Sequence, residues 1–179
     1  QQKDEYSFRK TGVKNVAIFT LHKKGIIAGN LTGQVVHTGS GAKWTCDPFE
    51  GLRIMFSAVL ANDKVIIVNK YWDKALQNSL LVFNKNLKLI SSVLVNHSEG
   101  QFNYMIKILK FIEARRGSFV VGMFENRGVC LFGLNGFKLI QVAVKMFASS
   151  WLNAMAVLEK GRFLITNWDC TSKAFRIIN

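Results

Sequence analysis

Short apolar runs separated by polar turn residues recur along the whole chain. The stretch Ser118–Leu134 is the clearest example, because two apolar runs, Phe119–Phe124 and Gly128–Leu134, flank the turn E-N-R-G. Each run is too short for a typical helix but has the length of a strand. The pattern therefore predicts a β-hairpin.

The same hairpin pattern occurs three more times in the chain. Equivalent positions in the four second strands are Val35, Leu81, Val129 and Phe175, at spacings of 46, 48 and 46 residues. A repeat of this length with four strands per unit is typical of β-propeller blades. We therefore predict an all-β, propeller-type fold with about four blades of antiparallel strands. We also expect Leu81 and Val129 to face the interior.

The predicted blades divide the chain into four units. They span about residues 13–46, 52–96, 104–145 and 151–179, after a polar segment, residues 1–12, in which we expect no blade. The fourth unit has only three predicted strands, which would leave an unpaired sheet edge. Either the N-terminal segment completes this blade, or the units are part of a larger propeller.

The composition favours strands and an anionic partner. The chain is 49% hydrophobic, with fourteen phenylalanines and one proline, which suits strands better than bundled helices. The formal net charge is +13. An excess of this size indicates nucleic acid, an acidic protein or a membrane surface as partner, and the alternative is that it serves solubility alone. There is no uncharged run long enough for a membrane span.

Much of the basic charge falls in turns that we expect on one face. Neighbouring strands of a blade run in opposite directions, so the turns after first strands and after third strands share a face. The alternative is that these residues only solvate tight turns, since no aromatic residue interleaves them to stack on bases. The candidate contacts for nucleic acid or an acidic partner are Lys23, Lys24, Lys64, Arg115, Arg116, Lys160 and Arg162.

The tryptophans fall into two groups. Trp44, Trp151 and Trp168 each lie at a predicted strand end, where we expect them to pack between blades. Tyr71 and Trp72 are predicted in a loop among charged residues, a common arrangement at protein interfaces. They are a candidate protein interface, and simple packing over the loop is the alternative.

The sequence offers no constellation for catalysis or metal binding. The histidines, His22, His37 and His97, have no cysteine or carboxylate ligands at metal-binding spacing. Neither a serine nucleophile motif nor a paired set of carboxylates is evident. The three cysteines, Cys46, Cys130 and Cys170, have no C-x-x-C spacing, which indicates a reduced, intracellular protein. We predict no enzymatic activity, no metal and no cofactor.

Residues 64–179 carry a family resemblance. The run S-F-V-V-G-M-F-E-N-R-G-V-C-L-F, followed later by S-S-W-L-N-A-M-A-V-L-E-K-G-R-F-L-I-T-N, resembles the C-terminal propeller region of three related scaffolds. These are the large subunit of the cleavage and polyadenylation specificity factor, the UV-damaged-DNA-binding scaffold and a propeller subunit of the branch-site splicing particle. Met123 stands where this family usually has an acidic residue. The resemblance implies a non-catalytic scaffold in nuclear RNA or DNA processing.

We therefore predict a non-catalytic interaction scaffold within a multi-subunit assembly. Its expected partners are other protein subunits and nucleic acid, and a nuclear location is favoured. The alternative is a small WD-repeat-like subunit of a mitochondrial or ribosome-associated complex, which the basic composition fits equally well.

Overall fold

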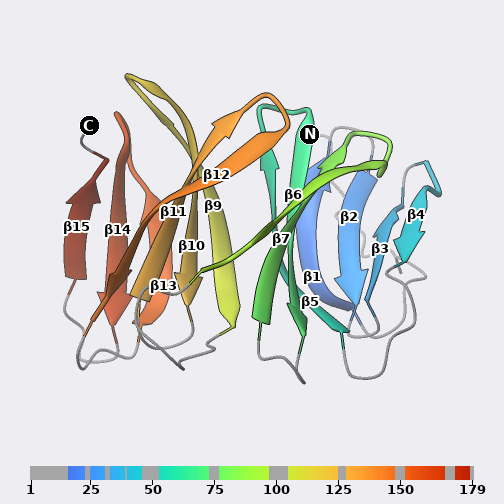
Figure 1. The fold of residues 1–179 in the computed structure, drawn as a ribbon, viewed down its shortest axis with the longest axis horizontal. Coiled ribbons are helices and arrows are strands. Elements are labelled where there is room, and N and C mark those ends of the chain that lie inside the picture. The colour runs from blue at the N-terminus through green and yellow to red at the C-terminus, as the bar shows by residue number, and fades with distance from the viewer. Residues whose placement is uncertain are drawn as a thin grey trace, which may run out of the picture.

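The computed structural model describes an all-β chain (Figure 1). No helix occurs among the described residues, so none there could span a membrane. The structure describes residues 16–22, 25–30, 33–38, 40–45, 53–72, 77–96, 105–124, 128–147, 152–167 and 172–177.

Within these ranges, fifteen strands form four antiparallel sheets, and in each sheet neighbouring strands follow chain order. The first sheet contains β1 (Val16–His22), β2 (Gly25–Asn30), β3 (Gln34–His37) and β4 (Lys43–Thr45). The second contains β5 (Arg53–Ala61), β6 (Val65–Trp72), β7 (Gln77–Asn84) and β8 (Leu89–Leu94). The third contains β9 (Ile106–Ala114), β10 (Gly117–Phe124), β11 (Gly128–Asn135) and β12 (Lys138–Met146). The fourth contains β13 (Leu152–Val157), β14 (Arg162–Asn167) and β15 (Ser172–Arg176).

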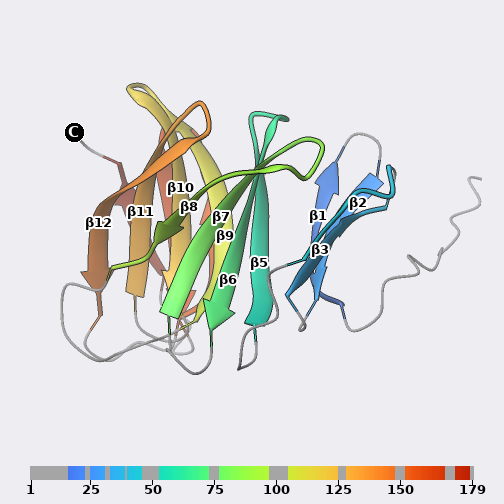
Figure 2. The ribbon, with the colours of Figure 1, turned by 45° about the vertical axis from the view of Figure 1, so that its right-hand side comes forward.

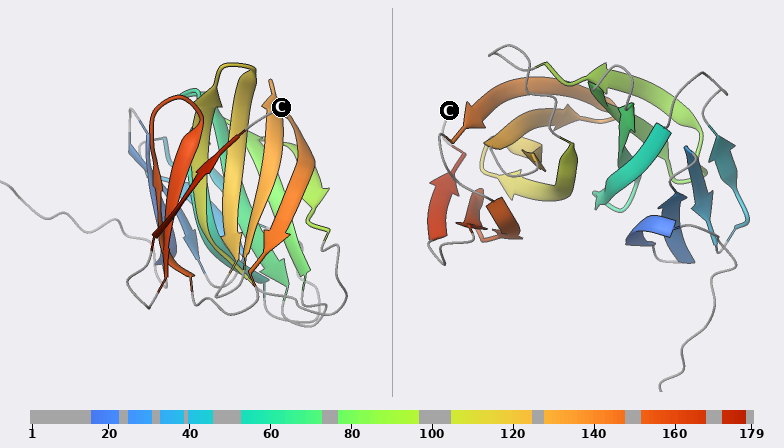
Figure 3. Two further views of the ribbon diagram at one scale, coloured as in Figure 1. Left: turned by 90° about the vertical axis from the view of Figure 1, so that its left-hand side faces the viewer. Right: turned by 90° about the horizontal axis from the view of Figure 1, so that it is seen from below.

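The four sheets follow one another along an open arc. The first strands β1, β5, β9 and β13 lie on its concave side and contact one another in turn (Figure 3, right). The last strands of the sheets lie on the convex side (Figure 3, right), and Figure 2 shows β8 running toward β12, which it contacts. The structure thus confirms an all-β fold of antiparallel sheets, and the described strands form an arc and not a closed ring.

Buried apolar clusters fill the spaces between successive sheets. Phe83 belongs to the cluster between the first two sheets, Phe132 to the next and Phe163 to the last. The predicted interior positions Leu81 and Val129 are 2% and 7% exposed, which confirms that they face inward. These sheets present alternate residues to both neighbours, because side chains along a strand point to opposite faces in turn.

One of the three tryptophans predicted to pack between blades lies in the described part of the chain. Trp44 packs edge-on against Phe83 of the second sheet, with 5.2 Å between ring centroids, so it does pack between sheets. Trp151 and Trp168 lie outside the described residues.

The predicted loop at Tyr71 and Trp72 is wrong. Both residues belong to β6 and are half-buried. Tyr71 pairs with Ile54 and Asn78, so backbone partners on both sides keep the strand extended. Aromatic side chains suit such a paired strand, and the neighbouring charges were a misleading sign of a loop.

The second and third sheets are joined by a buried polar node. The side-chain Oδ1 of Asn78 accepts hydrogen bonds from the backbone N–H of Ile106, at 3.0 Å, and from Nδ2 of Asn69, at 3.2 Å. The carbonyl of Ile106 in turn accepts from Asn69 Nδ2, at 3.2 Å, and from Ser57 Oγ, at 2.9 Å. Asn69 and Asn78 are fully buried. Side chains of the second sheet therefore satisfy the backbone at the start of β9.

We expect Asn78→Ala to lower the free energy of unfolding by roughly 1–3 kcal/mol for each buried donor left without its acceptor. Asn84→Ala is the matched control, because Asn84 Oδ1 also accepts two hydrogen bonds, from the N–H groups of Asn86 and Lys88, but at an exposed turn. Water can replace that acceptor, so the cost there should be smaller. Urea denaturation measures the loss in the free energy of unfolding for both variants, and equal losses would contradict a structural role for the node.

Candidate functional site

Basic side chains gather at one end of the sheets. The turns after the first strands of the second, third and fourth sheets all lie at the upper end in Figure 1. Lys23 and Lys24, predicted for the same face, lie outside the described residues. The remaining predicted contacts are exposed in these turns or, for Arg162, directly after one. We call them the basic turn row: Lys64, Arg115, Arg116, Lys160 and Arg162.

Contacts between the turns hold the row together. Gly161 lies against Ala114, which ends β9 directly before Arg115, so closely that a Cβ at Gly161 would be 2.7 Å from the Cβ of Ala114. On the other side, Asn62 Nδ2 donates to Ser118 Oγ at 3.5 Å. The three turns are therefore neighbours along the arc.

The turn of the fourth sheet has a defined conformation. Lys160 and Gly161 have φ angles of 57° and 71°, in the left-handed region that favours glycine. The N–H of Leu158 donates to the carbonyl of Arg162 at 2.8 Å, and Nε of Arg162 donates to the carbonyl of Glu159 at 3.3 Å. These bonds orient Arg162 beside the turn, and the missing side chain at Gly161 lets the turn approach β9.

The electrostatic balance of this end is positive. Asp63, Glu113 and Glu159 are the acidic residues in or next to the row. Further lysines lie in or directly after the turns that follow the third strands, which share this end: Lys85, Lys88 and Lys138. Within the described part of the chain, Arg115 and Arg116 make no ion pair or hydrogen bond through their side chains. Their guanidinium groups can therefore bind phosphate or carboxylate oxygens, for which they have the matching fork of donors.

The row suits contact with a charged backbone more than the reading of bases. Its side chains are Lys and Arg on exposed turns, without an aromatic residue among them. Phosphate contacts of this kind position a nucleic acid but carry no sequence information. The same arrangement can bind an acidic protein surface.

A second feature, which the sequence did not predict, lies between β12 and the β14–β15 hairpin, at the joint of the third and fourth sheets. Nζ of Lys173 lies over the ring of Phe147, 5.7 Å from its centroid, and Nζ of Lys145 lies 5.8 Å from the centroid of Phe175. Phe175 also stacks on Phe163 at 5.3 Å. We call these five residues the Lys-Phe cluster.

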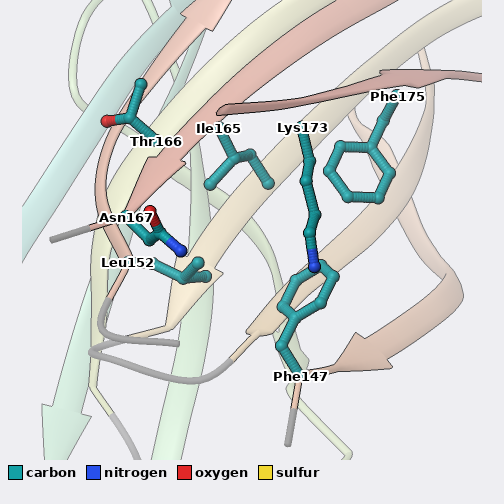
Figure 4. A pocket seen from close by; sticks show the side chains of 7 residues that line it. All are labelled: Phe147, Leu152, Ile165, Thr166, Asn167, Lys173 and Phe175. Atoms are coloured by element: carbon teal, nitrogen blue, oxygen red, sulfur yellow. The ribbon is translucent and has the colours of Figure 1, made fainter. Parts of the chain in front are cut away.

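The Lys-Phe cluster borders a small, shallow pocket that is open to solvent (Figure 4). The pocket is lined by Phe147, Leu152, Ile165, Thr166, Asn167, Lys173 and Phe175. A signal for it exists in the sequence, because the pattern K-x-F occurs at Lys145–Phe147 and again at Lys173–Phe175. Residues two apart share a face in extended chain, so each pattern places a lysine beside a phenylalanine.

The remaining candidate chemistry is buried or scattered. Burial raises the pKa of the Cys130 thiol, which therefore stays protonated at neutral pH, and its Sγ–H donates to the carbonyl of Gly122 at 3.5 Å. His37 is buried, and its Nδ1 is hydrogen-bonded with Ser40 Oγ at 2.7 Å. In the ranges that the structure describes, no three His, Cys, Asp or Glu side chains gather where they could hold a metal. His97, Cys46 and Cys170 lie outside those ranges.

Comparisons with known proteins identify the fold alone. No protein-family model matches the chain. No curated protein matches it either. Among solved structures, it is similar to a protein of unknown function from Bacteroides caccae, with a TM-score of 0.59 and 14% sequence identity over 90% of this chain and 60% of that chain. The chain therefore spans less than two thirds of this structure's length, and the family resemblance of residues 64–179 stays a prediction.

We expect Gly161→Ala to destabilise the chain by about 1–3 kcal/mol, because the added methyl would both strain a left-handed residue and collide with Ala114. Gly136→Ala is the matched control, since Gly136 also has a positive φ, 58°, but nothing lies within 4 Å of an added Cβ. Urea denaturation measures the loss in the free energy of unfolding for each variant, and the difference between the two losses measures the contribution of the contact between Gly161 and Ala114. If Gly161→Ala costs no more than Gly136→Ala, the turns are not held together as described.

Proposed function

We propose that this chain is a non-catalytic binding module of propeller type, and that its basic turn row docks on the phosphate backbone of a nucleic acid. The observation that carries the proposal is the contact of Gly161 with Ala114, which keeps the basic turns of the third and fourth sheets side by side. Charges fixed as neighbours attract a polyanion together, whereas charges on separate mobile loops lose conformational entropy on binding.

Three observations support a propeller-type arrangement. Sequence hairpins repeat at 46–48 residues, each sheet is an antiparallel meander, and the first strands of successive sheets contact one another on the concave side of an arc. Radial repetition of four-stranded sheets in this order is what defines a propeller. The surface formed by the turns of successive sheets would then be one continuous docking face.

The proposal extends to a place in a larger assembly. The net charge of +13 suits a component that lies against nucleic acid, and we propose a nuclear processing assembly on the basis of the resemblance in residues 64–179. A small WD-repeat-like subunit of a mitochondrial or ribosome-associated particle is the alternative. Both require a basic docking face, so the docking face can be tested without choosing between them.

The test is binding of a fluorescein-labelled oligouridine of about twenty nucleotides, long enough to cross several turns, followed by anisotropy over a series of salt concentrations. Contacts to single strands contribute about −0.7 each to the slope of log K against log salt. Arg115→Glu/Arg116→Glu should therefore flatten the slope by about 1.4 and weaken binding at least roughly tenfold.

The control is Lys145→Glu/Lys173→Glu, which changes the net charge equally but outside the turns of the row, since Lys145 pairs with Val129 and Lys173 with Ile165. It should stay within about threefold of the parent, because charges beyond a Debye length are largely screened. Equal losses of affinity in both variants would mean that only net charge matters, and would refute the proposed role of the basic turn row. If oligouridine binds neither chain but polyglutamate binds the parent and not the Arg115→Glu/Arg116→Glu variant, the partner is an acidic protein and the nucleic-acid proposal is wrong.

A further inference from the structure

The outer edge of β15 is open among the described residues. The N–H of Ile177 donates to the carbonyl of Gly161 at 2.9 Å, which extends the ladder between β14 and β15. Hydrogen-bonded residues alternate along an antiparallel strand, so Phe175 and Lys173 also turn their backbone groups toward β14. The backbone N–H and C=O groups that point away from β14 are therefore those of Ser172, Ala174 and Arg176.

At the joint between the second and third sheets, the fourth strand of the third sheet covers part of the second sheet. There β12 lies along β8, where Ser91 Oγ donates to the carbonyl of Phe137 at 3.0 Å. The side chain of Gln141 adds two bonds, since Nε2 donates to the carbonyl of Asn96 at 2.6 Å and Oε1 accepts from the N–H of Asn96 at 2.9 Å. As a result, Ser91 and Val93 of β8 are half-buried.

The corresponding surface at the next joint is exposed. Ser91 pairs with Val82 beside the bulge of its sheet, and Ala143 pairs with Leu131 beside the equivalent bulge of the third sheet. Ala143 and Lys145, the counterparts of Ser91 and Val93, are exposed.

Two large aliphatic residues lie on the same face of β12. Ile140 pairs with Gly133, and an added Cβ at Gly133 would meet Val142 Cγ2 at 3.5 Å. The side chains of Ile140 and Val142 therefore lie on the same face of the sheet as Gly133 and Leu131. Leu131 packs in the cluster next to the fourth sheet, so this face is turned toward that sheet. Ile140 and Val142 are 53% and 59% exposed. Exposed apolar surface beside an unpaired edge is typical of an interaction site.

We propose that the edge of β15 binds an extended segment of a partner protein as the antiparallel fourth strand of this sheet, and that this segment carries apolar and acidic side chains on the face turned to β12. Strand addition satisfies the open backbone groups, which proteins seldom leave unpaired. The apolar side chains would cover Phe175 and the aliphatic face of β12.

The charge at this joint specifies the acidic side chains. Lys145 and Lys173 both lie here, each over a phenylalanine ring, and Arg176 follows on the other face of the same edge. Opposite charges on neighbouring strands stabilise a pair, and like charges destabilise it. A basic strand should therefore be rejected. This inference does not depend on the basic turn row, because it rests on the outward backbone groups of β15 and on the face turned to β12. The two surfaces meet only at Arg176, which pairs with Arg162 of the row.

The test uses the full chain and a synthetic peptide of about ten residues, the length of a strand. Every second residue of the peptide is threonine, and the positions between are valine and glutamate alternately, so that one face carries the apolar and acidic side chains. A twin with lysine in place of glutamate is the specificity control. The chain variant is Ala174→Pro, which removes an outward N–H while proline is tolerated at an edge. Ala174→Ser, which keeps the N–H, is its matched control.

We expect the glutamate peptide to bind the parent and Ala174→Ser equally, and to bind Ala174→Pro at least roughly tenfold more weakly. The lysine peptide should also bind the parent at least roughly tenfold more weakly than the glutamate peptide does. Hydrogen exchange gives a second readout on the unmodified chain: the peptide should slow exchange of the amides of Ala174 and Arg176. Equal binding of both peptides would overturn the proposal, as would unchanged exchange at Ala174. Slow exchange at the amide of Ala174 before any peptide is added would also overturn the proposal, because the edge would then already be covered. Protection that grows with protein concentration would mean that a second copy covers the edge, and protection that does not would mean that this chain itself does.

Discussion

The arrangement of the described sheets depends on the buried amide node between β7 and β9. Apolar clusters fill every joint of the arc, but apolar contact is not directional and tolerates sliding of one sheet on another. The hydrogen bonds of Asn78 and Asn69 to Ile106 are directional, and they are made away from water, where a lost partner costs most. A one-residue slip between these sheets would leave buried donors unpaired, so the node fixes the register of the third sheet against the second.

From this node the positions of the turns follow. β9 begins at Ile106 and ends at Ala114, so fixing its start also fixes where Arg115 emerges. Gly161 then lies against Ala114 and carries the register on to the fourth sheet. At the convex side, the paired bonds of Gln141 with Asn96 restrain the same two sheets a second time. The basic turns are therefore part of a framework, and our proposal that scattered lysines and arginines act as one surface depends on it.

Features that depend on local patterns could be predicted from the sequence. Alternating apolar runs identified the hairpins and the inward positions Leu81 and Val129, and alternating strand direction was enough to gather the basic turns at one end. The strand at Tyr71 and Trp72 was missed because pairing on both sides, and not local polarity, keeps it extended. The Lys-Phe cluster was missed because Phe147 and Phe175 meet only through sheet packing. The choice of partner depends on surfaces of other molecules and has no local signature.

The central claim is that turns from different sheets act as a single docking surface. An NMR titration of the chain with an oligouridine tests it most directly, by following the backbone amides of all turns in one experiment. We predict that amides beside Lys64, Arg115 and Lys160 shift together, with one common dissociation constant, while those beside Lys173 do not shift. Shifts confined to one turn, separate dissociation constants for different turns, or shifts at the Lys-Phe cluster instead would contradict the account.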